Sequence, residues 1–139
     1  MIYTPSNAAK MITGEKDQTR LIVKDGDYPI FDYDLKSIFA VHRKARVIYQ
    51  VGKSYSIQPG RGKPAIGRRV LRAIRQERLQ EISEADAKAE GVEPFNSPFV
   101  GPLYMPSFAS HWDSIPRKAG ERWGDKPAVW VLEFEPVQK

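Results

Sequence analysis

The sequence predicts an α+β domain built on a small, mixed or antiparallel β-barrel with short helices between its strands. Short stretches rich in β-branched and aromatic residues recur along the chain, separated by glycine and proline turn signals. Helix caps and stops enclose only short segments. The 139 residues, 41% of them hydrophobic, are enough for one core, and no internal repeat is present. We therefore predict a single domain over residues 1–139.

The first elements follow from local signals. Residues 1–3 ("MIY") read as a short strand. Thr4 can cap a following helix, with a proline at its first position, and Gly14 is suited to end it in a left-handed conformation. The β-branched stretch 19–24 predicts a strand. Residues 25–45 carry turn signals and fit either a hairpin or a wrapped loop.

The middle of the chain contains strand, loop and mixed secondary-structure signals. Residues 46–58 alternate and are interrupted at Gly52, which favours two strands. Residues 59–67 are a loop of glycines and prolines. The segment 70–79 fits both a helical spacing and one face of a strand, so its pattern alone leaves both open.

The C-terminal third carries two helix signals. Ser83 and Asp86 resemble the capping box at the start of a helix, and Gly91 is suited to end that short helix. Residues 92–107 contain four prolines and one glycine and are expected to be an irregular connection. A second helix, with Ser107 as its cap, would carry three apolar residues at helical spacing. These are Phe108, Trp112 and Ile115.

Residues 116–127 read as a loop, and residues 128–137 as a final alternating strand. In that strand Trp130 is expected to lie in the core, with the other apolar residues of its face. Trp123, in the glycine-containing loop, is the better candidate for an exposed stacking platform.

Composition excludes several classes of protein. The absence of cysteine rules out disulfides, zinc-thiolate sites and thiol nucleophiles. No apolar run approaches a membrane span, and the N-terminus lacks signal-peptide features, so we expect a cytoplasmic protein. The only histidines, His42 and His111, have no metal-ligand spacing with other residues, so no metal or other cofactor is expected. We interpret His111 as structural.

A basic segment is the first candidate binding region. The net charge of +5 mildly favours polyanionic partners. Seven cations fall close together with a single acid between them, and arginine forks suit phosphates and bases. We favour nucleic-acid or nucleotide contact over a solvated strand whose arginine stems cover the barrel. The cations are Arg61, Lys63, Arg68, Arg69, Arg72, Arg75 and Arg78.

The second candidate lies in "GEKDQTR" at residues 14–20, at a helix-to-strand turn. Lys16 stands three residues before Thr19, so the two side chains can converge. Threonine is a nucleophile only when a base takes its proton, and lysine is such a base only when its surroundings favour the neutral amine. A carboxylate from elsewhere would be needed. From these residues alone a solvated turn is the simpler interpretation.

Several stretches together extend this view. They are "TGEKDQTR", "VGKSYSIQPG", "LQEISEADAKAEGV", "FASHWDSI" and "VWVLEFE". Over nearly the whole chain this arrangement resembles the ASCH domain family of the PUA-like β-barrel superfamily, and is similar to its phage and prophage members. The resemblance implies that residues 70–79 form a barrel strand. It also implies that RNA or a modified nucleoside binds in a basic cleft.

The family resemblance implies a reaction as well. Small ASCH proteins include an amidohydrolase of N4-acetylcytidine that uses a lysine, a threonine three residues later and a glutamate in a later helix. Lys16, Thr19 and Glu90 match these positions. By this analogy Thr19 attacks the acetyl carbonyl, Lys16 takes its proton, and Glu90 holds Lys16 or assists the leaving amine.

The chain departs from that family pattern next to the threonine. The amidohydrolases place an arginine two residues after it, where this chain has Leu21, while Arg20 follows Thr19 directly. We therefore expect a different pocket, with Arg20 and the cations between Arg61 and Arg75 as its candidate substrate-binding residues. Two alternatives remain open: a non-catalytic RNA-binding module and a ribonuclease acting on single strands.

Overall fold

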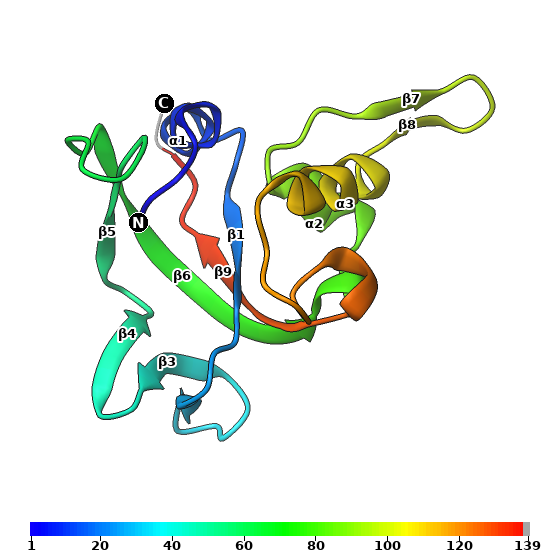
Figure 1. Ribbon diagram of the computed structural model, residues 1–139. Coiled ribbons are helices and arrows are strands. Elements are labelled where there is room, and N and C mark those ends of the chain that lie inside the picture. The colour runs from blue at the N-terminus through cyan, green and yellow to red at the C-terminus, as the bar shows by residue number, and fades with distance from the viewer. Residues whose placement is uncertain (138–139) are drawn as a thin grey trace.

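The computed structural model describes residues 1–137 of the chain. It is an α+β structure of short helices and a mostly antiparallel sheet (Figure 1). The elements, in chain order, are α1 (Pro5–Thr13), β1 (Gln18–Ile22), β2 (Asp27–Phe31), β3 (Ile38–Arg43), β4 (Arg46–Gln50), β5 (Ser54–Ile57), β6 (Gly67–Arg78), the 3-10 turn η1 (Leu79–Glu81), α2 (Glu84–Ala89), β7 (Phe95–Ser97), β8 (Gly101–Leu103), α3 (Met105–Ser114), the 3-10 turn η2 (Trp123–Asp125) and β9 (Ala128–Phe134).

Seven strands of the described chain form one sheet, whose main path runs β1-β9-β6-β3-β2. β4 extends it from β3 and β5 extends it from β6. The last strand, β9, lies between β1 and β6 and pairs antiparallel with both, so that Thr19 stands opposite Leu132. This pairing fixes β1, which carries the candidate threonine, against the interior of the molecule.

The local cap predictions are confirmed. The Thr4 hydroxyl accepts the Asn7 N–H at 3.2 Å, and Gly14 ends α1 with φ of 88°. Ser83 accepts the Asp86 N–H at 3.1 Å at the start of α2. Each cap depends on one or two residues that are close in sequence, which is why local patterns find it.

The two segments for which the sequence allowed two interpretations, residues 25–45 and 70–79, both form strands. Residues 25–45 contain the β2–β3 hairpin, and the ambiguous basic segment lies in the long strand β6. β6 pairs with β5 at one end and with β9 along most of its length. These long-range pairs override a local pattern that also fits a helix.

Three expectations about the connections were wrong. Residues 1–3 make only an isolated bridge, between Ile2 and Gln58. The stretch 92–107 contains the small β7–β8 hairpin, which projects beside α3 (Figure 1). α3 begins at Met105 rather than after Ser107, because the Glu84 carboxylate of α2 accepts the N–H groups of the N-cap residue Tyr104, at 2.7 Å, and of Met105, at 2.9 Å.

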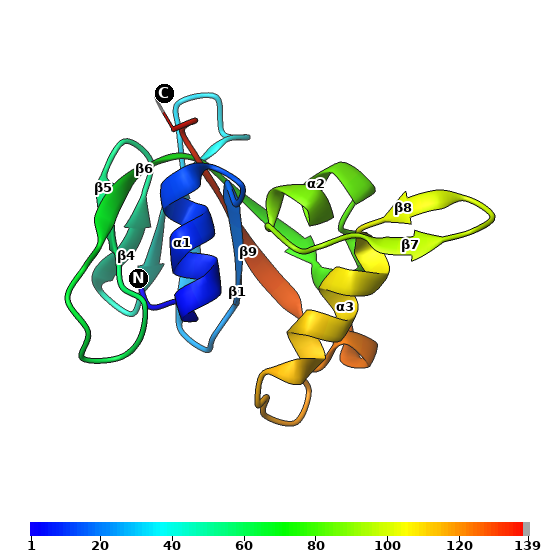
Figure 2. The same ribbon diagram turned by 90° about the horizontal axis from the view of Figure 1, so that it is seen from above.

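Two apolar clusters lie on the two faces of β9. Trp130, Leu132 and Phe134 pack into the larger cluster, which also contains α1, while Val129 and Val131 pack into the smaller cluster with α2 and α3. Figure 2 shows α1 and the α2–α3 pair on opposite sides of β9. The prediction that Trp130 lies in the core is confirmed.

The interpretation of Trp123 as an exposed platform was wrong. Its ring packs edge-on against Phe108 in the smaller cluster, with 6.2 Å between the ring centroids, and its main-chain N–H donates to the Asp113 carboxylate at 2.9 Å. The loop therefore folds back onto α3 instead of presenting the ring to solvent. No helix within residues 1–137 combines the length and the apolar character needed to cross a membrane.

Candidate active site

Lys16 lies in the turn between α1 and β1, and its side chain points inward. The turn is held in place because Lys16 N–H donates to Lys10 O at 3.1 Å and Asp17 N–H donates to Ala89 O at 2.7 Å. The Lys16 ammonium donates to Gln18 O at 2.7 Å, to Glu90 O at 3.1 Å and to the Glu90 carboxylate at 2.8 Å. The Lys16 ammonium therefore donates three hydrogen bonds, as many as it has N–H groups, in a buried position.

Thr19 lies near the start of β1 and is also buried. Its hydroxyl is 2.9 Å from the Tyr3 hydroxyl, and either group can donate. Burial raises the pKa of the Tyr3 phenol, despite the opposing effect of the bond with Thr19. Tyr3 is therefore a neutral hydrogen-bond partner for Thr19, and the base needed to activate a threonine nucleophile must come from another residue.

Glu90 joins the two cations of the cluster, Lys16 and Arg20. It caps the C-terminus of α2, and the left-handed glycine after it, Gly91 with φ of 88°, passes close to Lys16. One carboxylate oxygen lies 2.8 Å from Lys16 Nζ and the other 3.0 Å from Arg20 Nη1. Each glutamate oxygen thus has its own cation, as a buried carboxylate requires.

Arg20 connects this cluster to the acids of β6 and α2. Its Nη2 lies 3.3 Å from both Glu77 and Asp86, and its side chain is completely buried. Burial of Asp86 favours its neutral form, but a hydrogen bond from Gln18 and the charges of nearby arginines outweigh this and lower the pKa of Asp86. Arg20 therefore has carboxylate partners on two sides, which fixes its position beside Glu90.

A cavity of about 470 Å³ opens onto this cluster. Lys16, Thr19, Arg20 and Glu90 all line it, although Thr19 and Arg20 leave β1 on opposite faces, because the long Arg20 side chain reaches Glu90. The volume falls in the range of small-molecule sites. Its remaining walls come from the N-terminal segment, the loop at Gly60 and α3. These include Tyr3, Asn7, Leu21, Phe108, His111, Trp112 and Arg117.

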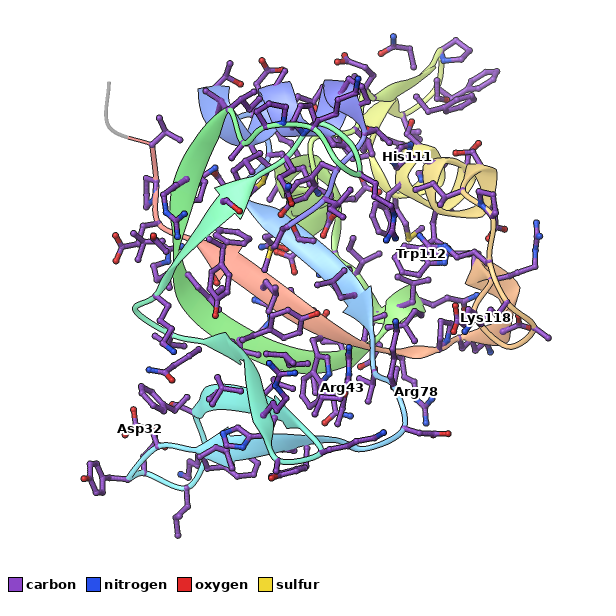
Figure 3. All side chains as sticks on the ribbon, turned by 60° about the vertical axis from the view of Figure 1, so that its left-hand side comes forward. Asp32, Arg43, Arg78, His111, Trp112 and Lys118 are labelled. Atoms are coloured by element: carbon purple, nitrogen blue, oxygen red, sulfur yellow. The ribbon has the colours of Figure 1, made fainter. Side chains whose placement is uncertain are left out.

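α3 supplies the aromatic side of this cavity. Figure 3 shows His111 and Trp112 on the side of α3 that faces α1 and β1. Arg117 lies 3.5 Å above the Trp112 ring, a cation–π contact that covers its face. Asn7 Nδ2 lies 3.3 Å from His111 Nε2. Burial, aided by the charge of Lys16, lowers the pKa of His111, so the imidazole is neutral at physiological pH.

The cations predicted from the basic segment do not gather around this cavity. Arg69 points inward and donates to three main-chain carbonyls and to Asp17, at 2.6 to 3.1 Å. Arg72 pairs with Glu133 at 2.8 Å. Arg75 pairs with Asp86 at 2.9 Å and Glu77 at 3.2 Å.

The other predicted cations are exposed. Arg68 lies on the outer side of β6, against Ser54. Arg61 and Lys63 lie in the loop before β6, and Arg78 lies at its far end. Of the predicted substrate-binding residues, only Arg20 therefore lines the cavity that Lys16, Thr19 and Glu90 share.

Chemically, the cluster offers a hydroxyl, a primary amine and a carboxylate at one small cavity. Such a set can support acyl transfer to the hydroxyl, with proton movement between the amine and the carboxylate. Among residues 1–137 no group of three or more histidine, aspartate and glutamate side chains is placed to hold a metal ion. Comparisons of this chain with protein-family models, curated proteins and solved structures find no match.

Tyr3 and His111 are among the residues of the site that the sequence did not predict. Tyr3 lies in a segment read only as a strand, and nothing in its neighbourhood indicates a bond to Thr19. His111 was assigned a structural role because a lone histidine on an apolar helix is usually a packed core residue. Its place at the cavity depends on how α3 meets α1, which is a tertiary arrangement.

Proposed function

We propose that this protein is a member of the ASCH family, with a PUA-like barrel, and that it hydrolyses the amide of an acylated nucleoside such as N4-acetylcytidine. The observation that carries the proposal is the shared cavity of Lys16, Thr19 and Glu90. The glutamate is 74 positions from the lysine in sequence and yet pairs with it at 2.8 Å. Two other cavities are also lined by a hydroxyl, a lysine and a carboxylate, but their carboxylates, Glu93 and Asp32, are exposed, whereas Lys16, Thr19 and Glu90 are all buried.

The reaction begins from the Lys16–Glu90 ion pair. Lys16 passes one proton to Glu90 and becomes a neutral amine. It then takes the hydroxyl proton of Thr19 as the threonine oxygen bonds to the acyl carbon. The tetrahedral intermediate collapses as Glu90 gives its proton to the leaving nitrogen, which breaks the amide and leaves an ester on Thr19.

Water completes the cycle. Glu90 accepts a proton from the attacking water, and Lys16 returns a proton to the threonine oxygen as the ester breaks. Acetic acid leaves and ionises to acetate in solvent, and the proton held by Glu90 passes to Lys16, which restores the ion pair. A base of this kind typically contributes about 100- to 10,000-fold to the rate.

The cavity supports a small substrate better than the two alternatives. A single-strand binder or a ribonuclease needs a groove of free cations along which a phosphate backbone can lie. Arg69 is inside the fold and Arg72 and Arg75 are ion-paired, so the cations of the predicted set that are exposed and unpaired within residues 1–137 are Arg61, Lys63, Arg68 and Arg78. None of these four lines the Lys16–Thr19–Glu90 cavity, to which the basic loop contributes only Gly60.

The test is hydrolysis of N4-acetylcytidine by the purified protein, followed by chromatography of cytidine and acetate. We expect turnover by the wild type, a loss of about 100- to 10,000-fold in Lys16→Met, and no detectable turnover in Thr19→Val. Thr13→Val is the matched control, because Thr13 is exposed at the end of α1 and should retain full activity. Shortening of RNA without nucleoside turnover would favour the ribonuclease instead.

A further inference from the structure

A second cavity, of about 600 Å³, adjoins the first. It lies between α1 and α3 and is closed on a third side by the segment leading into β7. Thr4, Asn7 and His111 line both cavities. The two are therefore compartments of one cleft, with the Asn7–His111 contact at their junction. The reactive cluster lies only in the first compartment.

The second compartment combines apolar residues, among them Phe95 and Pro106, with neutral hydrogen-bonding groups. Four serine hydroxyls join the Asn7 amide along its walls. They belong to Ser6, Ser107, Ser110 and Ser114. Ser114 donates to the His111 carbonyl at 2.6 Å, whereas the hydroxyls of the other three make no hydrogen bond within the described part of the chain. Such hydroxyls both donate and accept, which suits ligands that carry hydroxyl groups themselves.

The charges of this compartment cancel. Its one lysine, Lys10, donates to Gly91 O at 2.6 Å and lies 3.5 Å from the Glu93 carboxylate. Burial and the neighbouring charges of Lys16, Lys10 and Arg117 lower the pKa of His111 despite the opposing effect of Glu90, which favours the neutral imidazole. A phosphate placed here would meet the Glu93 carboxylate and no unpaired cation, so the lining disfavours an anionic ligand.

We propose that the second compartment is a subsite for an uncharged, hydroxyl-bearing part of the substrate, the ribose of the nucleoside. The base and its acyl group occupy the first compartment, beside Thr19, and the sugar passes the Asn7–His111 contact to reach Ser110 and its neighbours. This inference rests on the proposed function for the identity of the base, but the subsite itself is defined by its own lining.

The experiment measures binding, which does not depend on catalysis. Cytidine, cytosine and cytidine 5′-monophosphate are titrated into the wild type and into Ser110→Phe, because Ser110 lines only the second compartment and a phenyl ring there would fill it. Ser54→Phe is the control, since Ser54 is exposed on β5 and lines none of the cavities described above.

We expect the wild type and Ser54→Phe to bind cytidine about tenfold more tightly than cytosine, as one or two sugar hydrogen bonds would give. The 5′-phosphate should bring no gain. Ser110→Phe should lose the preference for cytidine and keep the affinity for cytosine. Equal binding of cytidine and cytosine, equal loss of both in Ser110→Phe, or binding of neither overturns the subsite. A preserved preference without any hydrolysis of N4-acetylcytidine overturns the proposed reaction alone.

Discussion

Replacing Glu90 by glutamine tests whether the buried ion pairs hold the candidate site together. The substitution keeps the shape of the side chain but removes the charge that faces Lys16 at 2.8 Å and Arg20 at 3.0 Å. A glutamine has one carbonyl oxygen, so it can serve one cation, while its NH2 group faces the other. Removing one partner of a buried ion pair costs about 3–5 kcal/mol. For a domain of this size that corresponds to a fall in Tm of about 10 °C or more.

The matched control is Glu133→Gln. Glu133 also pairs at 2.8 Å, with Arg72, but the side chains of that pair are 26% and 48% exposed, against 6% and 5% for Glu90 and Lys16. Because an exposed pair of the same length contributes about 0–1 kcal/mol, Glu133→Gln should change stability little. The two variants thus differ mainly in burial.

Urea denaturation followed by circular dichroism at neutral pH measures both free energies of unfolding. We expect Glu90→Gln to lower the transition midpoint strongly, with an unchanged slope, and Glu133→Gln to leave it near that of the wild type. If Glu90→Gln costs no more than Glu133→Gln, the reasoning from burial is refuted, and the cluster is not the rigid arrangement that the proposed reaction needs.

Three further predictions concern residues around the cluster. Arg69→Met leaves three main-chain carbonyls and a carboxylate without their donor, so it should destabilise the protein by about 3–5 kcal/mol in urea denaturation; a loss below about 1 kcal/mol would contradict this role. Gly91→Ala forces a side chain onto a left-handed residue and brings its Cβ within 2.8 Å of Lys16 Cβ, so it should cost at least about 1–2 kcal/mol and slow turnover. Folding lowers the pKa of His111 below its ordinary value of 6.5, so on acidification the unfolded chain takes up the imidazole proton at a higher pH than the folded protein does. The stability of the wild type should therefore fall as the pH drops through about 6.5. His111→Gln should lack this part of the slope, and identical pH profiles for the two proteins would contradict it.

Local signals predicted the elements that depend on neighbouring residues. Thr4, Gly14 and Ser83 act within one turn of the chain, so their roles could be deduced from their positions. The start of α3 could not, because its cap is the Glu84 carboxylate, 20 positions away from Tyr104. The strand β6 was equally beyond a local argument, since its register is set by pairing with β5 and β9.

The candidate site also contains residues that local spacing predicts and residues that only the folded chain brings together. Lys16 and Thr19 lie three residues apart at a turn, and that spacing alone suggested that they could converge. Glu90 was included only through a resemblance, because no local pattern connects α2 to β1. Arg69 was grouped with the candidate substrate-binding cations because it lies in the basic segment between Arg61 and Arg78. Its four acceptors come from α1, the following turn and the C-terminal segment, and only the folded chain assembles them.

The most direct test of the proposed reaction compares Thr19→Ser and Thr19→Val in hydrolysis of N4-acetylcytidine. Both variants preserve most of the side-chain volume, but only serine keeps a hydroxyl at this position of the cavity. If Thr19 is the nucleophile, wild type and Thr19→Ser release cytidine and acetate in equal amounts, and Thr19→Val releases neither while remaining folded. Turnover by Thr19→Val at the wild-type rate, or no turnover by the folded wild type, would contradict the assignment.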